Sequence, residues 1–345
     1  MRGAASRLTY AAWVLACLLV AGCQPQLQSR APAASVTTQV APPPAAPAAP
    51  GTEARLLFKS GFEEGVVLTD PQLRFGQWRQ QLRGADQGYE WSTDLLGSPV
   101  DFQYLVSGND ARDVTALHRF VETRIDSVVG HDGRTTRALF QALRGKGTIG
   151  QTQNDFIVFD MQNAQSGYVR CWVKLQPNLL DLMTQEGDWR VLFEWKETPA
   201  FTTLPPGIDF QYRWLVMISR RKPTRDSAFD GLAWKVEGDV VTPEQAATGT
   251  PWTDDWTIWN NQVRVPLGEW FPFEVQWKLD PGSGGRLVVW VDGQVVADHR
   301  QRTQVGWSRG KLYLFENYMG AEPLRRGEAY QWVDEFELWS DLPPR

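Results

Sequence analysis

Apolar and polar residues alternate with a period of two over most of the chain beyond residue 55. The alternating runs are rich in aromatic and β-branched residues and are separated by Gly, Pro and Asp, as in strands joined by turns. Helical periodicity is weak and is confined to residues 115–122 and 178–186. The alternation predicts strands over residues 56–62, 156–161, 167–175, 189–196, 208–219, 232–237, 269–279, 286–292, 311–318 and 330–339.

Two loops carry clear turn signals. Asp292-Gly293 separates two apolar runs, and an Asp-Gly pair suits the positive backbone dihedrals of a two-residue hairpin. The glycine-rich stretch 280–285 predicts a second turn. Many short strands, few helices and no internal repeat together indicate an all-β fold, a sandwich of two antiparallel sheets, over residues 54–345.

The first 22 residues have the features of a secretion signal. Arg2 and Arg7 form a basic start, a short apolar run follows over residues 10–21, and small residues lead to Cys23. The end of this run resembles the lipobox of bacterial lipoproteins, in which the cysteine is lipidated and becomes the mature N-terminus. The resemblance implies a lipid anchor at Cys23 and a place in the bacterial cell envelope, at the outer membrane or the cell surface. An ordinary signal peptide with a chance cysteine is the alternative.

Residues 23–53 are dominated by Pro, Ala and Gln and have no apolar period. Such a composition favours an extended spacer, so we expect an anchor, a linker and a folded domain in that order. Cys17 leaves with the signal peptide, which makes Cys171 the only thiol of the domain. Its place in an alternating strand predicts a small buried residue and not a nucleophile.

Composition narrows the possible functions. The chain holds 17 Trp, 16 Phe and 8 Tyr but only 3 His and 3 Cys, and no Cys/His group has zinc spacing. A net charge of −5 disfavours a nucleic-acid partner. No run after residue 23 reaches the roughly 20 apolar residues of a membrane-spanning helix, so we expect contact with a membrane through the lipid anchor only.

Four segments of the domain resemble one family of sandwich proteins. Residues 57–63 (LFKSGFE) look like the opening strand of concanavalin A-like jelly rolls. Residues 270–278 (WFPFEVQWK) and 286–293 (RLVVWVDG) are similar to a Trp-rich hairpin of that family, and residues 333–339 (VDEFELW) to its closing strand. Among these jelly rolls the pattern is most similar to the polysaccharide lyases that include heparin and glucuronan lyases. The resemblance implies a jelly-roll β-sandwich and action on an acidic polysaccharide.

Alternation also predicts a ligand face. If the strands over 167–175, 189–196, 208–219 and 232–237 are neighbours, they share an outer face that is basic and carries aromatic rings. Rings can stack on sugars, and arginines can pair with carboxylates or sulfates. A solvated face without a ligand is the alternative, since Lys and Arg are common there. The predicted substrate-binding residues are Tyr168, Trp172, Arg190, Glu194, Lys196, Gln211 and Lys235, beside Arg170, Lys174 and Arg213.

β-Elimination from a uronic acid needs a group that neutralises the sugar carboxylate, a base and an acid. We expect Arg170 and Arg213 to neutralise the carboxylate, and Lys174 or Tyr318 to transfer protons. Tyr318 aligns with a tyrosine of the resembled lyases. Leu314 and Glu316 stand where those lyases have Lys and Gly, so an ordinary strand aromatic is the alternative for Tyr318.

Two further expectations concern hydrolysis and metal binding. Retaining glucanases of this fold carry Glu-x-Asp-x-x-Glu on one strand, and the chain lacks that spacing, which disfavours such a hydrolase. The resemblance also implies a structural calcium between the opening and closing strands, with Glu63 and Asp334 as ligands. Three functions therefore stay open: a polysaccharide lyase, a non-catalytic carbohydrate-binding lipoprotein, and a structural envelope component whose tryptophans fill a core.

Overall fold

A computed structural model describes residues 54–74, 76–95, 100–106, 111–144, 152–158, 165–197, 209–222, 231–249, 252–306 and 310–344 of the chain. Two large antiparallel sheets, one of eight strands and one of nine, hold most of these residues. The chain crosses repeatedly from one sheet to the other: β9 and β10 belong to the first, β11 to the second, and β12 to the first again. The predicted all-β class, a sandwich of two antiparallel sheets, is confirmed. The signal, the anchor Cys23 and the linker lie outside the described residues.

The eight-stranded sheet has the order β19-β18-β17-β12-β21-β10-β9, and β1 pairs with the second half of β21. The predicted Asp-Gly hairpin joins β18 to β19, with positive φ at Asp292 (50°) and Gly293 (70°). The strands are β1 (Leu56–Ser60), β9 (Val121–Val129), β10 (Thr135–Leu143), β12 (Ser166–Leu175), β17 (Trp270–Lys278), β18 (Arg286–Val291), β19 (Gln294–His299) and β21 (Ala329–Trp339).

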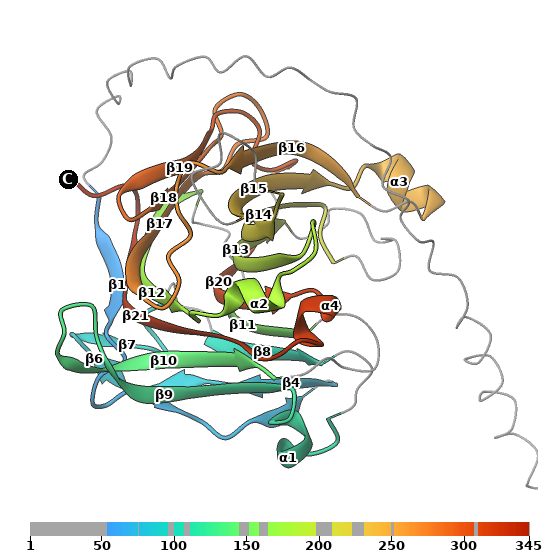
Figure 1. The fold of residues 1–345 in the computed structure, drawn as a ribbon. Helices are drawn as coiled ribbons and strands as arrows, with labels where there is room; N and C mark the ends of the chain where they lie inside the picture. Colours follow the sequence, from blue (N-terminus) through green and yellow to red (C-terminus); the bar gives the residue numbers. More distant parts are fainter. Residues whose placement is uncertain are drawn as a thin grey trace, which may run out of the picture. The chain divides into compact units, whose positions relative to one another are not determined.

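The nine-stranded sheet has the order β16-β15-β14-β13-β20-β11-β8-β4-β3. Figure 1 shows β16, β15, β14 and β13 side by side in this sheet. The strands are β3 (Gln72–Arg74), β4 (Gln77–Gln80), β8 (Val100–Val106), β11 (Thr152–Val158), β13 (Trp189–Glu197), β14 (Tyr212–Arg220), β15 (Leu232–Val240), β16 (Thr253–Asn260) and β20 (Gly310–Met319).

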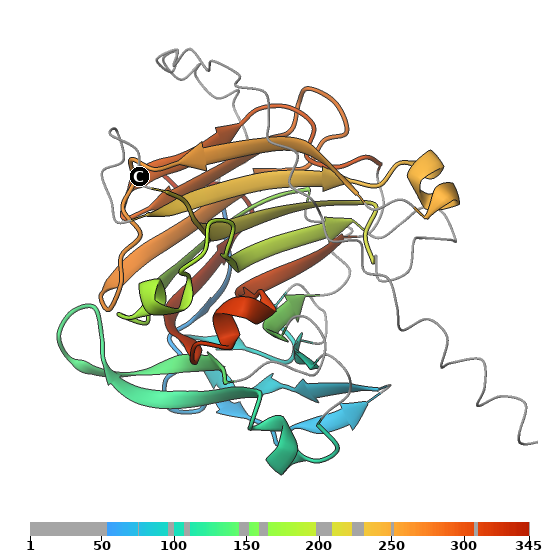
Figure 2. The same ribbon diagram turned by 45° about the vertical axis from the view of Figure 1, so that its right-hand side comes forward.

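Short elements complete the described fold. Two small ribbons pair β2 (Val67–Leu68) with β5 (Leu82–Arg83), and β6 (Ala85–Asp86) with β7 (Tyr89–Glu90). Among the described residues no helix is long and apolar enough to cross a membrane. In Figure 2, α3 projects from the ends of β15 and β16. The helices are α1 (Val114–Leu117), α2 (Leu179–Leu182), α3 (Pro243–Thr248) and α4 (Ala321–Leu324).

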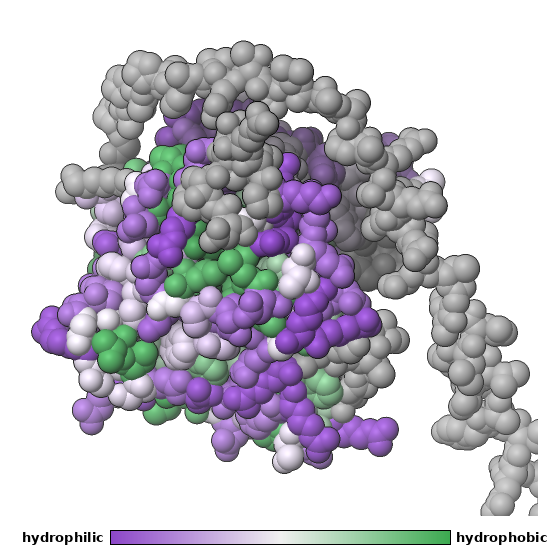
Figure 3. All heavy atoms as spheres, viewed as in Figure 1, coloured by the Kyte–Doolittle hydropathy of each residue, from purple (hydrophilic) through white to green (hydrophobic). Residues whose placement is uncertain are grey.

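Aromatic side chains fill the space between the two sheets. Trp195, Trp214 and Trp234 are fully buried, and Trp214 stacks on Phe193 and on Trp195 with ring centroids 5.7 and 6.0 Å apart. Each such ring buries a large apolar area, so the buried tryptophans contribute much of this core. The face seen in Figure 3 is mostly hydrophilic, with separate apolar (green) patches.

Candidate functional site

The outer face of the nine-stranded sheet carries a group of ionisable side chains at its centre. Alternation along β13 and β14 sends Trp195 and Trp214 into the core and places Lys196 and Arg213 on the outer face. On β20, Phe315 has a positive φ of 50°, and the register shifts around it. We call the following group the charged cluster: Asp155, Glu194, Lys196, Arg213, Asp239, Tyr313, Glu316 and Tyr318.

Glu194 lies at the centre of the charged cluster. It is fully buried, and Lys196 Nζ and Arg213 Nη1 lie 3.4 and 3.5 Å from its two carboxylate oxygens. Neither oxygen accepts a hydrogen bond from the described residues. Burial raises the pKa of Glu194, while Lys196 and Arg213 oppose that rise. A buried carboxylate with unsatisfied oxygens costs stability, and such groups concentrate at functional sites.

Two more carboxylates approach Glu194 from neighbouring strands. Asp155 on β11 is 2% exposed, and Glu316 on β20 is fully buried. Burial, with the charges of Glu194 and Asp209, raises the pKa of Asp155 well above its usual value. Burial, with the charges of Glu194 and Asp155, raises the pKa of Glu316 in the same way. Gln153 Nε2 donates to Glu316 Oε1 over 3.5 Å, and one oxygen of each carboxyl has no partner among the described residues. Burial therefore favours the protonated form of both carboxyls.

Lys196 connects the carboxylates to a phenol. Its Nζ lies 3.2 Å from Asp209 Oδ1 and 4.7 Å from the centre of the Tyr313 ring. Burial lowers the pKa of Lys196, but Glu194, Tyr313 and Asp209 outweigh burial and raise it well above the usual value. Burial likewise raises the pKa of Tyr313. At neutral pH the pair is thus an ammonium ion beside a protonated phenol.

Arg213 extends the charged cluster toward the edge of the sheet. Its Nε donates to Asp239 Oδ2 over 2.7 Å, and its guanidinium lies 4.5 and 4.8 Å from the rings of Phe210 and Trp252. Burial raises the pKa of Asp239 to about 6, although Arg213 opposes it. The two rings and the carboxylate hold the guanidinium in one orientation, and Trp252 is 40% exposed. Arg213 is therefore preorganised beside an accessible aromatic ring.

The structure brings only part of the predicted ligand face together. Glu194, Lys196, Arg213 and Tyr318 share the outer face of the nine-stranded sheet, and Tyr318 packs edge-on against Trp189 with centroids 4.7 Å apart. Burial raises the pKa of Tyr318, so its phenol is protonated. Lys235 pairs with Glu237 on the same sheet face, and Gln211, directly before β14, is 7% exposed.

The prediction that residues 167–175 belong to this face is wrong. β12 lies in the eight-stranded sheet between β17 and β21, because strand pairing depends on the whole chain and not on order in sequence. The four residues predicted from this strand therefore lie on the outer face of the other sheet. They are Tyr168, Arg170, Trp172 and Lys174.

Arg190 was expected on the outer face and instead points into the sandwich. The register shifts between Val191 and Phe193, so the extra residue reverses the alternation before it. Arg190 is fully buried and donates to Gln331 Oε1 over 2.9 Å, and burial lowers the pKa of its guanidinium to about 9. It is a structural residue of the interior.

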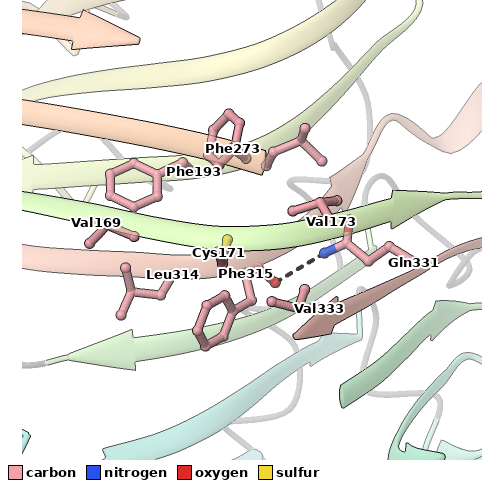
Figure 4. Close-up of a pocket in the computed structure, with 10 residues that line it drawn as sticks. Val169, Cys171, Val173, Phe193, Phe273, Leu314, Phe315, Gln331 and Val333 are labelled. Carbon is pink, nitrogen blue, oxygen red and sulfur yellow. Dashed lines mark hydrogen bonds between the residues drawn. The ribbon is translucent and has the colours of Figure 1, made fainter. Parts of the chain in front are cut away.

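A small gap between the sheets lies beside Cys171 (Figure 4). It is lined by apolar side chains and by Gln331, whose Nε2 donates to Phe315 O over 3.4 Å. Its volume of about 10 Å³ is the size of one water at most. Cys171 is 3% exposed, which confirms the prediction of a buried residue, and burial raises the pKa of its thiol.

Several residues of the charged cluster were missed from the sequence. Asp155, Tyr313 and Glu316 come from β11 and β20, which are more than 150 residues apart in sequence. A signal was present in β20, because Glu316 is a lone carboxylate within a largely apolar run, whereas Asp155 follows the polar residues 152–154. Asp239 was missed because β15 extends to Val240, beyond the predicted end at residue 237.

Two groups of oxygen ligands could hold a metal ion. Glu63 and Asp334, the residues predicted for calcium, both lie beside Thr136, whose Oγ1 is 2.6 Å from Glu63 Oε1 and 3.3 Å from Asp334 Oδ2. Burial, with Glu335 and Glu63 nearby, raises the pKa of Asp334 to about 7. The crowded carboxylates fit a hard cation such as calcium. The second group is Glu237, Asp239 and Asp254, whose carboxylates lie within 4.8 Å of one another.

No protein-family model and no curated protein sequence matches the chain. Solved structures do match. An endo-β-1,4-glucuronan lyase from Trichoderma reesei has a TM-score of 0.43 at 12% identity, covering 63% of this chain and 87% of that one. The alginate lyase Aly36B has a TM-score of 0.38 at 15% identity, covering 64% and 83%.

The κ-carrageenase of Pseudoalteromonas carrageenovora, solved with an oligosaccharide of κ-carrageenan, has a TM-score of 0.38 at 9% identity, covering 86% of this chain and 98% of that one. At such identities the likeness concerns the β-sandwich alone. The chain is an all-β sandwich similar in fold to polysaccharide lyases and a carrageenase. Any assignment of activity therefore has to be argued from the residues of this chain.

Proposed function

We propose that the protein binds an acidic polysaccharide across the outer face of the nine-stranded sheet and cleaves it by β-elimination at the charged cluster. One observation carries the proposal: Lys196 and Arg213 flank the buried, unsatisfied carboxylate of Glu194 beside protonated phenols. Cations, a proton acceptor and a proton donor are the groups that this reaction needs.

The roles follow from charge and position. Arg213 and Lys196 pair with the uronate carboxylate and so make the proton on the adjacent carbon, C5, more acidic. Glu194, whose raised pKa makes its carboxylate a stronger base, takes that proton. The electron pair of the C–H bond forms the C4–C5 double bond as the C4–O4 bond breaks. Tyr318 or Tyr313 gives its phenolic proton to the departing O4, so that protons and electrons balance.

Hydrolysis is a second candidate, because three carboxyls meet in the charged cluster. Glu194, Glu316 and Asp155 come from neighbouring strands, and burial raises the pKa of each. Paired carboxyl groups of different pKa are what glycosidic hydrolysis uses, one as acid and one as nucleophile or base. This arrangement spans several strands, which is why a search for a motif on one strand does not find it.

One experiment separates the candidates. The purified full chain is incubated with alginate, polyglucuronate and neutral β-glucan, and both ultraviolet absorbance and reducing ends are followed. β-Elimination yields a conjugated unsaturated uronate, so absorbance and reducing ends rise together. Reducing ends without absorbance indicate hydrolysis. Binding without either product leaves a non-catalytic carbohydrate-binding lipoprotein, and neither binding nor product with any glycan contradicts the proposal.

We also propose that the chain is an extracytoplasmic lipoprotein anchored through Cys23, as the first 53 residues indicate. An anchor would keep an enzyme that acts on large polymers at the cell envelope. Replacing Cys23 by Ser should release the protein from the membrane fraction of a bacterial host. Labelling with a palmitate analogue in the parent chain, and its loss in the variant, is the direct measurement.

Calcium at Glu63 and Asp334 is a further proposal, supported by their shared contact with Thr136. An ion there would join the loop after β1 to β21 and compensate two neighbouring carboxylates. It would act on stability and not on the reaction. Excess EGTA should lower the thermal midpoint of the parent chain, and Asp334→Asn should remove the difference between EGTA and calcium chloride.

A further inference from the structure

The outer face of the eight-stranded sheet carries a row of large side chains that face one another in register. Lys174 on β12 is opposite Trp270 on β17 and opposite Trp332 on β21. Trp332 is in turn opposite Phe140 on β10, and Phe140 is opposite Arg124 on β9. We call these five residues the aromatic row. The row crosses five neighbouring strands, and the end of β9 also reaches Trp270, whose Nε1 donates to Val129 O.

The aromatic row runs in the order Trp270, Lys174, Trp332, Phe140 and Arg124, so each cation lies beside at least one ring. Lys174 Nζ lies 6.0 Å from the centre of the Trp270 ring and 5.7 Å from that of Trp332. At the other end Arg124 Cζ lies 3.8 Å above the Phe140 ring. Tyr330 meets Trp332 edge-on with centroids 5.2 Å apart and adds a further ring. The two indoles stand two strands apart, so they can contact different sugars of one extended chain.

Both indole rings are held in place while remaining partly exposed. Trp270 Nε1 donates to Val129 O over 2.8 Å, and Trp332 Nε1 donates to Asp126 Oδ2 over 3.4 Å. Because the polar atom of each ring is satisfied by β9, the ring need not be reoriented or desolvated at its N–H when a ligand arrives. A ring preorganised in this way loses little conformational entropy on binding.

The aromatic row contains two cations, Arg124 and Lys174, which differ in their ion pairs. Arg124 forms ion pairs with Glu122 and Asp126, so its positive charge is compensated by these carboxylates. Lys174, in contrast, has no carboxylate partner within the part of the chain that the structure describes. Its ammonium lies between two indole rings and is free to meet an anion from solution.

We propose that the aromatic row is a second binding surface for an anionic polysaccharide, separate from the charged cluster. The sugar rings lie against Trp332 and Trp270 through their C–H faces, and Lys174 pairs with a carboxylate or sulfate between them. The row lies on the other sheet, so it cannot contribute to the reaction at Glu194. The aromatic row holds the polymer while the charged cluster acts on it. Binding at the row is independent of which reaction the charged cluster catalyses.

The test measures retention of the full chain on immobilised alginate. Lys174→Met keeps the length of the side chain and removes its charge, and we expect about a fivefold loss of affinity, the size of one exposed ion pair with its ring contacts. Trp332→Ala should lose about tenfold, the lower part of the range for removing one stacked ring. Turnover of a soluble oligosaccharide should change less than twofold in both. Lys278→Met, at an exposed lysine of the same sheet outside the row, is the matched control and should bind as the parent does.

Repeating the series in the Arg213→Met background shows whether the losses of affinity depend on this arginine of the charged cluster. The inference is overturned if Lys174→Met and Trp332→Ala retain parental affinity in both backgrounds, because the row then serves only the packing of the sheet. Equal retention on immobilised neutral amylose would also overturn it, because the occupant would not be anionic. Trp332→Ala could lose affinity because it lowers the thermal midpoint of the protein. Lys174→Met alters no ring, so its affinity tests the inference independently of such a loss of stability. If the parent chain is retained but shows no turnover, and Lys174→Met and Trp332→Ala lower retention as expected, the result counts against the proposed reaction alone.

Discussion

The outer faces of the two sheets hold their charges in opposite ways. In the charged cluster the side chain of Glu194 is fully buried and those of Lys196 and Arg213 are 11% and 14% exposed. In the aromatic row the side chain of Arg124 is 40% exposed, and its charge lies on the face of a ring. The charged side chains of the charged cluster are thus largely buried, whereas the charge of Arg124 in the aromatic row stays accessible to water.

This difference separates a face suited to chemistry from a face suited to adhesion. Burying several charges costs stability, and packed apolar residues would often serve the fold as well or better. The charged cluster nevertheless leaves oxygens of Glu194, Asp155 and Glu316 without partners among the described residues. Ions in such surroundings interact strongly with a substrate and have shifted pKa values. The aromatic row has little desolvation cost and offers contact area instead.

The largest effect is expected in the core that both faces share. Trp214 is fully buried between Phe193 and Trp195, so Trp214→Ala leaves a cavity and should cost about 3–5 kcal/mol of unfolding free energy. Denaturant titration measures the loss. Turnover and glycan retention should fall together as the folded fraction falls, and a separate fall of one would show that the two faces do not share one folding unit.

Arg213→Met should abolish turnover and spare retention. It removes the guanidinium beside Glu194 and Asp239, and a lost electrostatic contact to the reacting group should lower kcat at least about 100-fold. Initial rates on a soluble polyuronate oligosaccharide measure this loss. Arg286→Met, which breaks an exposed pair with Asp298 on the other sheet, is the matched control. Parental rates in Arg213→Met would remove the charged cluster from the mechanism.

Glu316→Gln should stabilise the fold at high pH. Burial raises the pKa of Glu316, so the folded state binds this proton more tightly than the unfolded state, and stability falls as pH rises above the ordinary glutamate value. Glutamine removes that loss, so the variant should gain about 1–2 kcal/mol at pH 8 and nothing at pH 4. Unfolding titrations at both values check the sign. Glu322→Gln, at an exposed helix residue, should change stability by less than about 0.5 kcal/mol. An equal gain at both pH values would contradict the account.

The smallest expected effect is a difference in sensitivity to salt. Raising the ionic strength from about 0.1 M to about 1 M shortens the Debye length from about 10 Å to about 3 Å. Lys174 is partly exposed, so retention on alginate should weaken severalfold, whereas kcat, set by buried ions, should change less than twofold. Both are measured on one protein sample. Retention that is insensitive to salt would argue that rings alone bind the glycan.

The sequence by itself determined the class of fold and the local facing of many side chains. Period-two alternation correctly predicted ten strands to within a few residues, and it placed Arg213 and Lys196 opposite the core tryptophans. It also located the Asp292-Gly293 hairpin, because the backbone of a tight turn depends on adjacent residues only. It gave no strand for β3, β4, β8, β9, β10, β16 and β19 of the two large sheets.

Only the tertiary structure decided which strands are neighbours and therefore which residues form a site. Pairing of β12 with β17 and β21 moved Lys174 and Trp172 to the other sheet, and one extra residue near Val191 turned Arg190 inward. The meeting of Glu194 with Glu316 likewise depends on pairing between β13 and β20. Alternation is a local property of the backbone, whereas strand order and register minimise the free energy of the whole core, so no segment read alone contains them.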